Sequence, residues 1–256
     1  MPSSPLATRI NSSVDKALEV FSFFLGQDEG WTISDLSRRT GMYKSRIYRI
    51  IKTFEKHEIL RLNEKTGKYE LGSIIKINSL VQNGKHRSQR VHEILRDLSK
   101  ETSGTAILRK KLGWKLLTVD VAVSDHPLRI SYEKGTRHPL TFGAAGKIFI
   151  AYDSPPLTEV LQHYNYRLPS FTKKSITDPS KWKASICKVK AKGYYLSDGE
   201  TIWGGRGIAV PVTDKQGHLL AALSLALPTV LFPLSRLPGL LSKTREAAEK
   251  IGELLA

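Results

Sequence analysis

Apolar residues recur at helical spacing in three successive segments near the start of the chain. After Ser12, the first segment carries an apolar stripe that consists of Val14, Ala17, Leu18, Phe21, Phe24 and Leu25. The second segment runs from Thr32, with Asp35 in the capping position three residues later, to the turn residue Gly41. The third, residues 43–57, carries its stripe on Ile47, Ile50, Ile51 and Phe54. Because such a stripe is typical of the buried face of an amphipathic helix, we expect three helices packed on one another.

The opposite face of the third predicted helix is basic. At about 100° per residue, the side chains that point away from its apolar stripe include Ser45, Arg49, Lys52 and Lys56. A short helix joined through a glycine to a longer basic helix is typical of a helix-turn-helix, in which the second helix enters the major groove of DNA. The residues on this helix that we expect to contact DNA are Lys44, Ser45, Arg46, Tyr48, Arg49 and Lys52. The alternative is a three-helix bundle whose charged face is merely solvated.

A β-hairpin is predicted directly after the third helix. Residues 60–63 and 68–71 alternate between apolar and polar positions, and Thr66 and Gly67 supply the turn between them. A hairpin at this place is the wing of a winged helix-turn-helix. We expect Lys65 and Lys68, at and beside its turn, to contact phosphate groups.

The remaining pattern predicts a helical linker followed by a mixed domain. Apolar residues at helical spacing over 73–84 indicate the linker, a polar break follows at 85–90, and a new helix begins near 91. Strands are expected at 105–110, 114–123, 128–133, 207–213 and 219–227, and further helices at 144–152, 157–164, 178–193 and the C-terminal end. The expected organisation is a flexible N-terminus (1–9), a winged helix-turn-helix (10–72), a linker (73–90) and an effector-binding and oligomerisation domain (91–256). The fold class is α+β, with helices flanking a curved antiparallel sheet in the last domain.

Net charge adds a class of partner to this picture. The 256-residue chain has a formal net charge of +16, shared between its first 90 residues and the rest. Because Lys and Arg side chains that neutralise phosphates release condensed counterions, this charge favours nucleic acid as the partner. No apolar run is long enough to span a membrane, and residues 1–9 do not have the apolar core of a secretory signal. We therefore expect a soluble, cytoplasmic protein with no membrane partner.

Segments that resemble catalytic motifs lack the residues that the chemistry needs. Around the glycine-rich stretch 143–147, Thr141 and Ile148 stand where a phosphate loop has Gly and Ser or Thr. His57 and His92 each precede a glutamate, but arginine stands where a second zinc-binding histidine would be required. Serine nucleophile elbows are absent from the sequence as well. We expect no catalytic site, no metal and no cofactor.

The single cysteine, Cys187, excludes internal disulfides and cysteine-based zinc clusters. It could in principle serve as a nucleophile. Its place beside Ile186 and near Val189 on a predicted helix favours a packed side chain instead.

Motifs in both predicted domains resemble IclR-type bacterial transcriptional regulators. The N-terminal stretches that carry the resemblance are 13–18, 32–41, 44–51 and 69–72, and the C-terminal ones are 135–140, 145–147, 193–200, 207–211 and 221–228. The resemblance implies a GAF/PAS-like domain that binds a small carboxylate or aromatic acid through backbone amides at a helix start, formed by Ala144, Ala145 and Gly146. It further implies an opposite wall that consists of Ser197, Asp198, Gly207, Ser224 and Ala226. The small residues on both sides are also compatible with simple close packing of helix on sheet.

The function expected from the sequence is therefore that of a homodimeric or homotetrameric regulator. It would bind a double-stranded DNA operator and respond to a small-molecule effector. One alternative is a non-specific architectural DNA-binding protein whose C-terminal domain only oligomerises. A more remote one is an enzyme with an appended DNA-binding module.

Overall fold

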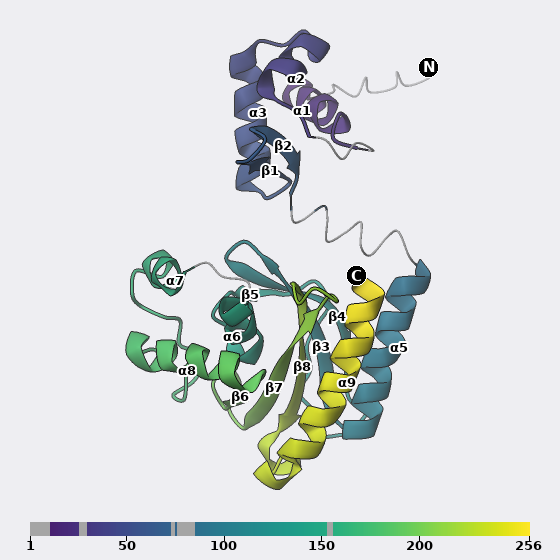
Figure 1. Ribbon diagram of the computed structural model, residues 1–256, viewed down its shortest axis with the longest axis vertical. Helices are drawn as coiled ribbons and strands as arrows, with labels where there is room; N and C mark the ends of the chain where they lie inside the picture. The colour runs from purple at the N-terminus through teal and green to yellow at the C-terminus, as the bar shows by residue number, and fades with distance from the viewer. Residues whose placement is uncertain (1–10, 26–29, 73–74, 76–84, 153–155) are drawn as a thin grey trace, which may run out of the picture. The chain divides into compact units, whose positions relative to one another are not determined.

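The computed structural model describes residues 11–25, 30–72, 75, 85–152 and 156–256. The chain divides into two compact units, Met1–Ser79 and Leu80–Ala256, which are treated separately below (Figure 1). The predicted flexible residues 1–9 lie outside the described residues, and so does nearly all of the predicted linker helix over 73–84.

The N-terminal unit contains the three predicted helices and the predicted hairpin. Its elements are α1 (Ser12–Ser22), α2 (Ile33–Thr40), α3 (Lys44–Lys56), β1 (Leu60–Asn63) and β2 (Lys68–Leu71). The Thr32 hydroxyl caps α2 by accepting a hydrogen bond from the Asp35 amide, and Gly41 ends this helix with a φ of +70°. The cap of α1 is Asn11, whose side chain accepts from the amides of Ser13 and Val14. The winged helix-turn-helix topology predicted from the sequence is confirmed.

The core of this unit corrects one part of the predicted pattern. Val20 of α1 and Phe24, in the turn that follows α1, are buried against Leu36 of α2 and against Ile47 and Ile51 of α3. Three apolar residues of the predicted α1 stripe point to solvent instead, with exposed fractions of 54% for Val14, 59% for Leu18 and 57% for Leu25. A helix on a small bundle buries one narrow face, and in α1 that face is centred on Val20.

The hairpin is antiparallel, with Leu60 opposite Leu71 and Asn63 opposite Lys68. A further bridge joins Trp31 to Tyr69, so the segment before α2 lies along the outer edge of β2. Gly30 makes this approach possible: its φ is +66°, and a Cβ atom there would lie 2.6 Å from the Tyr69 carbonyl oxygen. The wing is thereby attached to the start of the helix-turn-helix.

The C-terminal unit is built on a six-stranded antiparallel sheet in the order β5-β4-β3-β8-β7-β6. The strands are β3 (Thr105–Leu112), β4 (Lys115–Ala122), β5 (Arg137–Pro139), β6 (Tyr195–Asp198), β7 (Gly205–Thr213) and β8 (Leu219–Pro228). Helices α5 (Lys85–Thr102) and α9 (Leu237–Leu255) cover one face, while α6 (Gly143–Tyr152) and α8 (Pro179–Lys192) lie on the other side, with α7 (Leu157–His163) beyond them (Figure 1). Each face has its own apolar core. The predicted α+β class and curved antiparallel sheet are confirmed.

Three boundaries in this unit differ from the predictions. Helix α5 begins at Lys85, where we expected a polar break, because neither Gly nor Pro interrupts the chain between Lys85 and Thr102. The predicted strand at 128–133 is irregular, and the short β5 (Arg137–Pro139) pairs with β4 instead. Strand β6 (Tyr195–Asp198) was not predicted at all. The apolar residues at 128–133 are explained by a cavity, described below, toward which Ile130 and Tyr132 point.

The prediction that Cys187 is packed is wrong. On α8, the side chains of Trp182, Ile186 and Val189 are buried, whereas Cys187 is exposed. One residue beyond Ile186 along a helix is a rotation of about 100°, which turns Cys187 away from the sheet.

Within the described segments, no helix combines the length and apolar content that crossing a bilayer requires.

Candidate functional site

One side of α3 presents all the side chains that the sequence predicted for it. Lys44, Ser45, Arg46, Tyr48, Arg49 and Lys52 are each exposed. The opposite side is fixed in the core by Ile47 and Ile51, both fully buried. This anchoring gives the helix a defined orientation, so its outer side chains project from a rigid support.

The cations on α3 are not equivalent. Lys52 donates to the Glu55 carboxylate at 2.6 Å and lies over the Tyr48 ring at 5.8 Å, and the hydrogen bond with Glu55 raises the pKa of Lys52. In contrast, Arg46 and Arg49 form no ion pair with any residue that the structure describes. These two guanidinium groups therefore remain available to an external anion, as does the exposed ammonium of Lys44.

The hairpin offers a second basic position. Lys65 is exposed at the turn, and its amide donates to the Asn63 side chain at 3.1 Å. Asn63 in turn donates to Glu70 at 2.6 Å, and Arg61 pairs with the same carboxylate at 3.1 Å. Lys68 is half-buried, so the tip of the wing presents Lys65 more fully than Lys68.

In the C-terminal unit, a cavity lies between the start of α6 and the sheet. It contains about 430 Å³ of free space, including solvent at its mouth. Among the residues predicted for an effector site, those that line it are Ala144, Ala145, Ser197, Gly207, Ser224 and Ala226. Strands β7 and β8 are paired here, with Gly207 opposite Ala226. Residues of the α6 start and residues of these strands line the same cavity, so the two walls predicted from separate motifs do face one cavity.

Gly146 and Asp198, also predicted for this site, do not line the cavity. A Cβ atom on Gly146 would lie 2.2 Å from the Leu140 carbonyl oxygen, so this glycine permits close packing of α6 on the preceding turn. Asp198 pairs with Arg206 at 3.0 Å, and the hydrogen bond from Arg206 lowers the pKa of the Asp198 carboxyl. Both residues shape the surroundings of the cavity from outside its wall.

The most unusual group on the cavity wall is Arg109 of β3, which we did not predict. Its side chain is buried, with 3% of its surface exposed, and its guanidinium lies 4.7 Å from the centre of the Tyr132 ring and 5.7 Å from that of Phe142. The Nε and Nη2 atoms of Arg109 have no hydrogen-bond partner among the described residues, and neither does the buried Ser224 hydroxyl. Burial lowers the pKa of the Arg109 guanidinium. Lys110 and Lys111 follow Arg109 on the same strand, so the local sequence pattern does not distinguish the buried cation from its neighbours.

The first turn of α6 contributes backbone donors to the same cavity. Gly143, Ala144 and Ala145 line it, and Gly143 has a φ of +59°. The first amides of a helix lack partners inside the helix and carry the positive end of its dipole. The cavity therefore combines backbone N–H groups with a buried cation, and its described lining includes no Asp or Glu.

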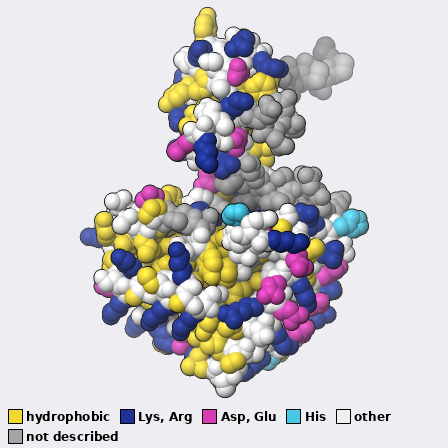
Figure 2. Space-filling view, viewed as in Figure 1, with side chains coloured by type: hydrophobic (Ala, Val, Ile, Leu, Met, Phe, Trp, Pro, Cys, Tyr) yellow, Lys and Arg dark blue, Asp and Glu magenta, His cyan; other side chains and the backbone are white. Residues whose placement is uncertain are grey.

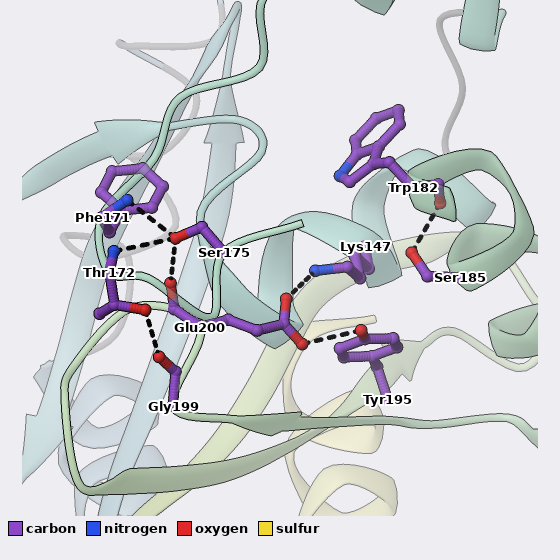
Figure 3. Close-up of polar contacts among 9 residues, drawn as sticks. All are labelled: Lys147, Phe171, Thr172, Ser175, Trp182, Ser185, Tyr195, Gly199 and Glu200. Carbon is purple, nitrogen blue, oxygen red and sulfur yellow. Dashed lines mark hydrogen bonds and ion pairs between the residues drawn. The ribbon is translucent and has the colours of Figure 1, made fainter. Parts of the chain in front are cut away.

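Beneath the cavity, a buried ion pair joins α6 to the loop after β6 (Figure 3). Lys147, only 2% exposed, donates to the Glu200 carboxylate at 2.6 Å, and the Tyr195 hydroxyl donates to the other oxygen at 2.8 Å. The Lys147 ammonium also lies 4.4 Å from the centre of the Tyr195 ring. Burial and the adjacent Glu200 charge raise the pKa of Tyr195, while burial lowers the pKa of Lys147. This lysine, which the sequence placed in a failed phosphate loop, is thus a structural cation.

The same network holds a loop against the sheet edge (Figure 3). The Ser175 hydroxyl donates to the Glu200 carbonyl at 2.7 Å and accepts from the amides of Phe171 and Thr172. The residue after Glu200, Thr201, lines the cavity and would contact a Cβ atom on Gly143 at 3.1 Å. The Lys147–Glu200 pair therefore fixes two parts of the cavity wall relative to each other.

Two family sequence models match the chain. The model described as the IclR helix-turn-helix domain matches residues 13–64, and the one described as the bacterial transcriptional regulator IclR C-terminal domain matches residues 84–253. Together they cover both compact units.

Individual relatives and solved structures agree with these matches. The regulator KdgR of Escherichia coli is 30% identical over 248 residues, which cover 93% of this chain and 92% of KdgR. The regulator BhcR of Paracoccus denitrificans is 26% identical, over 93% of this chain and 85% of BhcR. The crystal structure of a putative IclR transcriptional regulator from Silicibacter sp. TM1040 is similar with a TM-score of 0.64 at 25% identity, covering 95% of this chain and 96% of that one.

A further similar structure was solved with a ligand. It is an IclR homologue from Microbacterium hydrocarbonoxydans complexed with 4-hydroxybenzoate, with a TM-score of 0.60 at 23% identity, covering 95% of this chain and 98% of that one. At this level of identity the likeness establishes a shared fold.

Proposed function

Because this chain belongs to the IclR family of bacterial transcriptional regulators, we propose that α3 reads an operator sequence while the C-terminal cavity binds the effector that modulates this reading. The protein is a DNA-binding transcriptional regulator with an effector-binding C-terminal domain. We assign residues 10–72 to DNA binding, 73–90 to the linker and 91–256 to effector binding and oligomerisation.

The observation that carries the proposal is the pair of free guanidinium groups on α3. Arg46 and Arg49 are exposed and unpaired within the described part of the chain, on a helix whose other side is fixed by Ile47 and Ile51. A guanidinium can bind O6 and N7 of guanine through two hydrogen bonds, which is the commonest specific contact in the major groove. We assign Lys44, Ser45, Tyr48 and Lys52 to supporting contacts on α3, and Lys65 and Lys68 of the wing to phosphate.

The experiment that tests this proposal starts from a random-sequence duplex library. Duplexes are selected with the full-length protein, and affinity for the selected duplex is compared with a scrambled duplex of equal length at several salt concentrations. We expect tighter binding to the selected duplex by roughly a thousandfold or more, with both affinities falling as salt rises. Equal affinities would contradict operator reading.

A non-specific architectural DNA-binding protein remains the second candidate, and α8 is the feature that favours it. This helix has no acidic residue and carries five exposed lysines, Lys181, Lys183, Lys188, Lys190 and Lys192. Lys and Arg side chains also gather over the C-terminal unit on the face shown in Figure 2. If the α8 lysines provide most of the affinity for DNA, neutralising them would weaken binding to any duplex, while substitutions on α3 would have little effect on affinity.

We further propose that the regulator is a homodimer whose N-terminal units pair through α1. The exposed Val14 and Leu18 lie one helical turn apart on α1 and form an apolar surface, away from the buried Val20. Substituting Leu18→Ser is expected to weaken binding to the complete selected duplex roughly tenfold to a hundredfold, because burying a leucine contributes on the order of 1.5–3 kcal/mol.

An isolated half-site duplex serves as the control for this substitution. A single bound unit does not use the α1 surface, so Leu18→Ser should bind the half-site as the unsubstituted protein does. Equal losses on both duplexes would show a folding defect and contradict pairing through α1.

The C-terminal unit presents a second apolar surface, which we propose as its self-association contact. Trp203 is 73% exposed, and the Thr229 amide donates to the Gly204 carbonyl at 2.8 Å, which places exposed Val230 near it. Trp203→Ser is expected to reduce the oligomer size measured by sedimentation velocity, without a change in secondary structure. An unchanged sedimentation coefficient would remove this surface from the interface.

The effector is proposed to be a small organic acid. The support is the cavity itself, with backbone amides at the start of α6 and the Arg109 side chain, and the 4-hydroxybenzoate bound to the similar Microbacterium protein.

The curated relatives are regulators, so we also propose that this chain has no catalytic activity and acts in the cytoplasm, where operator DNA lies.

A further inference from the structure

We infer that Arg109 is the residue that selects the effector, and that it selects ligands with one carboxylate on an apolar body. This inference rests on the proposed effector-binding function of the cavity and specifies its ligand. The proposed function assigns backbone amides of α6 to anion binding, whereas the structure adds a buried side chain with a full positive charge.

The first step is the state of the Arg109 guanidinium. Its Nε and Nη2 atoms have no partner among the described residues, although only 3% of the residue's surface is exposed. A guanidinium remains charged in proteins and can only donate, and among the described residues only Tyr132 favours its charged form, so burial leaves the charge incompletely compensated. Such an arrangement is typical of a site that a ligand completes.

The second step is to identify which charged groups around the cavity already have a partner of opposite charge. Arg206, the other cation on the wall, pairs with Asp198 at 3.0 and 3.2 Å and donates to the Phe232 carbonyl. The described lining contains no carboxylate that could neutralise Arg109. One unneutralised cation remains, so a ligand with one negative charge balances the wall.

The third step is the geometry that holds Arg109 in place. Its guanidinium lies against the faces of Tyr132 and Phe142, and these ring contacts stabilise the cation while its Nε and Nη2 atoms stay without a partner among the described residues. The planar fork therefore stays free to bind both oxygens of one carboxylate, a geometry that a lysine cannot reproduce.

The fourth step is the second set of donors and the rest of the wall. The unpaired Ser224 hydroxyl belongs to β8, which pairs with β3 beside Arg109, and the first turn of α6 lines the same cavity. The remaining lining is largely aliphatic and includes Ile107, Ile130, Ile202, Ile208 and Leu225. A ligand that fits both regions has a carboxylate at one end and an aliphatic or aromatic body.

Calorimetric titration of the full-length protein with matched probes tests the inference. Benzoate and hexanoate are the monoacids, benzamide and hexanamide are their neutral counterparts, and terephthalate carries a second carboxylate. We expect at least one monoacid to bind roughly tenfold to a hundredfold more tightly than its amide and than terephthalate. Equal binding of acid and amide overturns the inference, as does the absence of monoacid binding at millimolar concentration.

Two substitutions connect the result to Arg109. Arg109→Met keeps a long apolar side chain between the rings and should lose monoacid binding by a similar factor, while Arg109→Lys should retain an intermediate affinity. Lys115→Met removes one exposed positive charge from the neighbouring strand β4 and should bind as the unsubstituted protein does. Retention of full affinity by Arg109→Met overturns the inference. The acid-to-amide comparison needs no substitution and decides the case even if Arg109→Met does not fold.

The outcome is separable from that of the proposed function. Binding of the selected duplex by the same protein samples, without any probe, reports on operator reading alone. Specific DNA binding together with no preference for monoacids overturns only the assignment of Arg109. Loss of specific DNA binding contradicts the proposed function whatever the probes do.

Discussion

The double substitution Arg46→Ala/Arg49→Ala is expected to lower affinity for the selected duplex on the order of a hundredfold. Each arginine that binds a guanine through two hydrogen bonds contributes about 1–3 kcal/mol of discrimination. Both side chains are exposed and free of ion pairs within the described residues, so their removal should leave the three-helix core intact. Fluorescence anisotropy measures the affinities for the selected and the scrambled duplex. The ratio of the two affinities should fall close to one.

The matched control removes the same charge from another helix. Lys181→Ala/Lys183→Ala on α8 also eliminates two exposed cations, and we expect only a small, sequence-independent loss. Similar losses from the two double variants would mean that charge alone carries the binding. That result would favour the architectural alternative.

The substitution Lys147→Ala is expected to destabilise the C-terminal unit by about 3–5 kcal/mol, because it leaves Glu200 buried without its cation. A loss of this size is a large part of the stability of a typical domain. The shift in the urea unfolding midpoint, with the slope unchanged, measures it.

A double substitution distinguishes the lost charge from lost packing. Lys147→Met/Glu200→Gln removes both charges and keeps side chains of similar length. The side-chain carbonyl oxygen of the introduced glutamine can still accept the hydrogen bond from the Tyr195 hydroxyl. We expect this variant to be clearly more stable than the single Lys147→Met, which packs alike but leaves Glu200 unpaired, since breaking a buried pair on one side costs more than replacing both sides. Equal stability of the two variants would show that the ion pair does not determine the loss.

The regular elements were predictable because local chemistry fixes them. Thr32 and Gly41 delimit α2, and Asp178 and Gly193 delimit α8, through caps that operate within a few residues of sequence. The α3 surface followed from the same periodicity. Predictions of burial failed where tertiary contacts determine which face of a helix is covered. Leu18 matched a helical stripe but lies on the outside of α1, and Cys187 lies one residue away from a buried face.

The cavity was only partly predictable for a related reason. Small residues such as Gly207 and Ala226 marked two facing strands, but Gly146 carries the same signal and serves close packing instead. Arg109 escaped prediction because its environment is made by Tyr132 and Phe142, which are distant in sequence. Whether a charged residue of a strand lies in a cavity depends on the sheet order, which local patterns do not contain.

Replacement of single guanines by 7-deazaguanine along the selected duplex is the most direct test of sequence reading by α3, because it removes the N7 acceptor and leaves the phosphates unchanged. A homodimer with two recognition helices predicts losses at guanines in two symmetric half-sites, centred about one helical turn or a multiple of it apart. These losses should disappear in Arg46→Ala/Arg49→Ala. Unchanged affinity at every guanine, with binding that depends only on salt, would contradict base reading by these arginines.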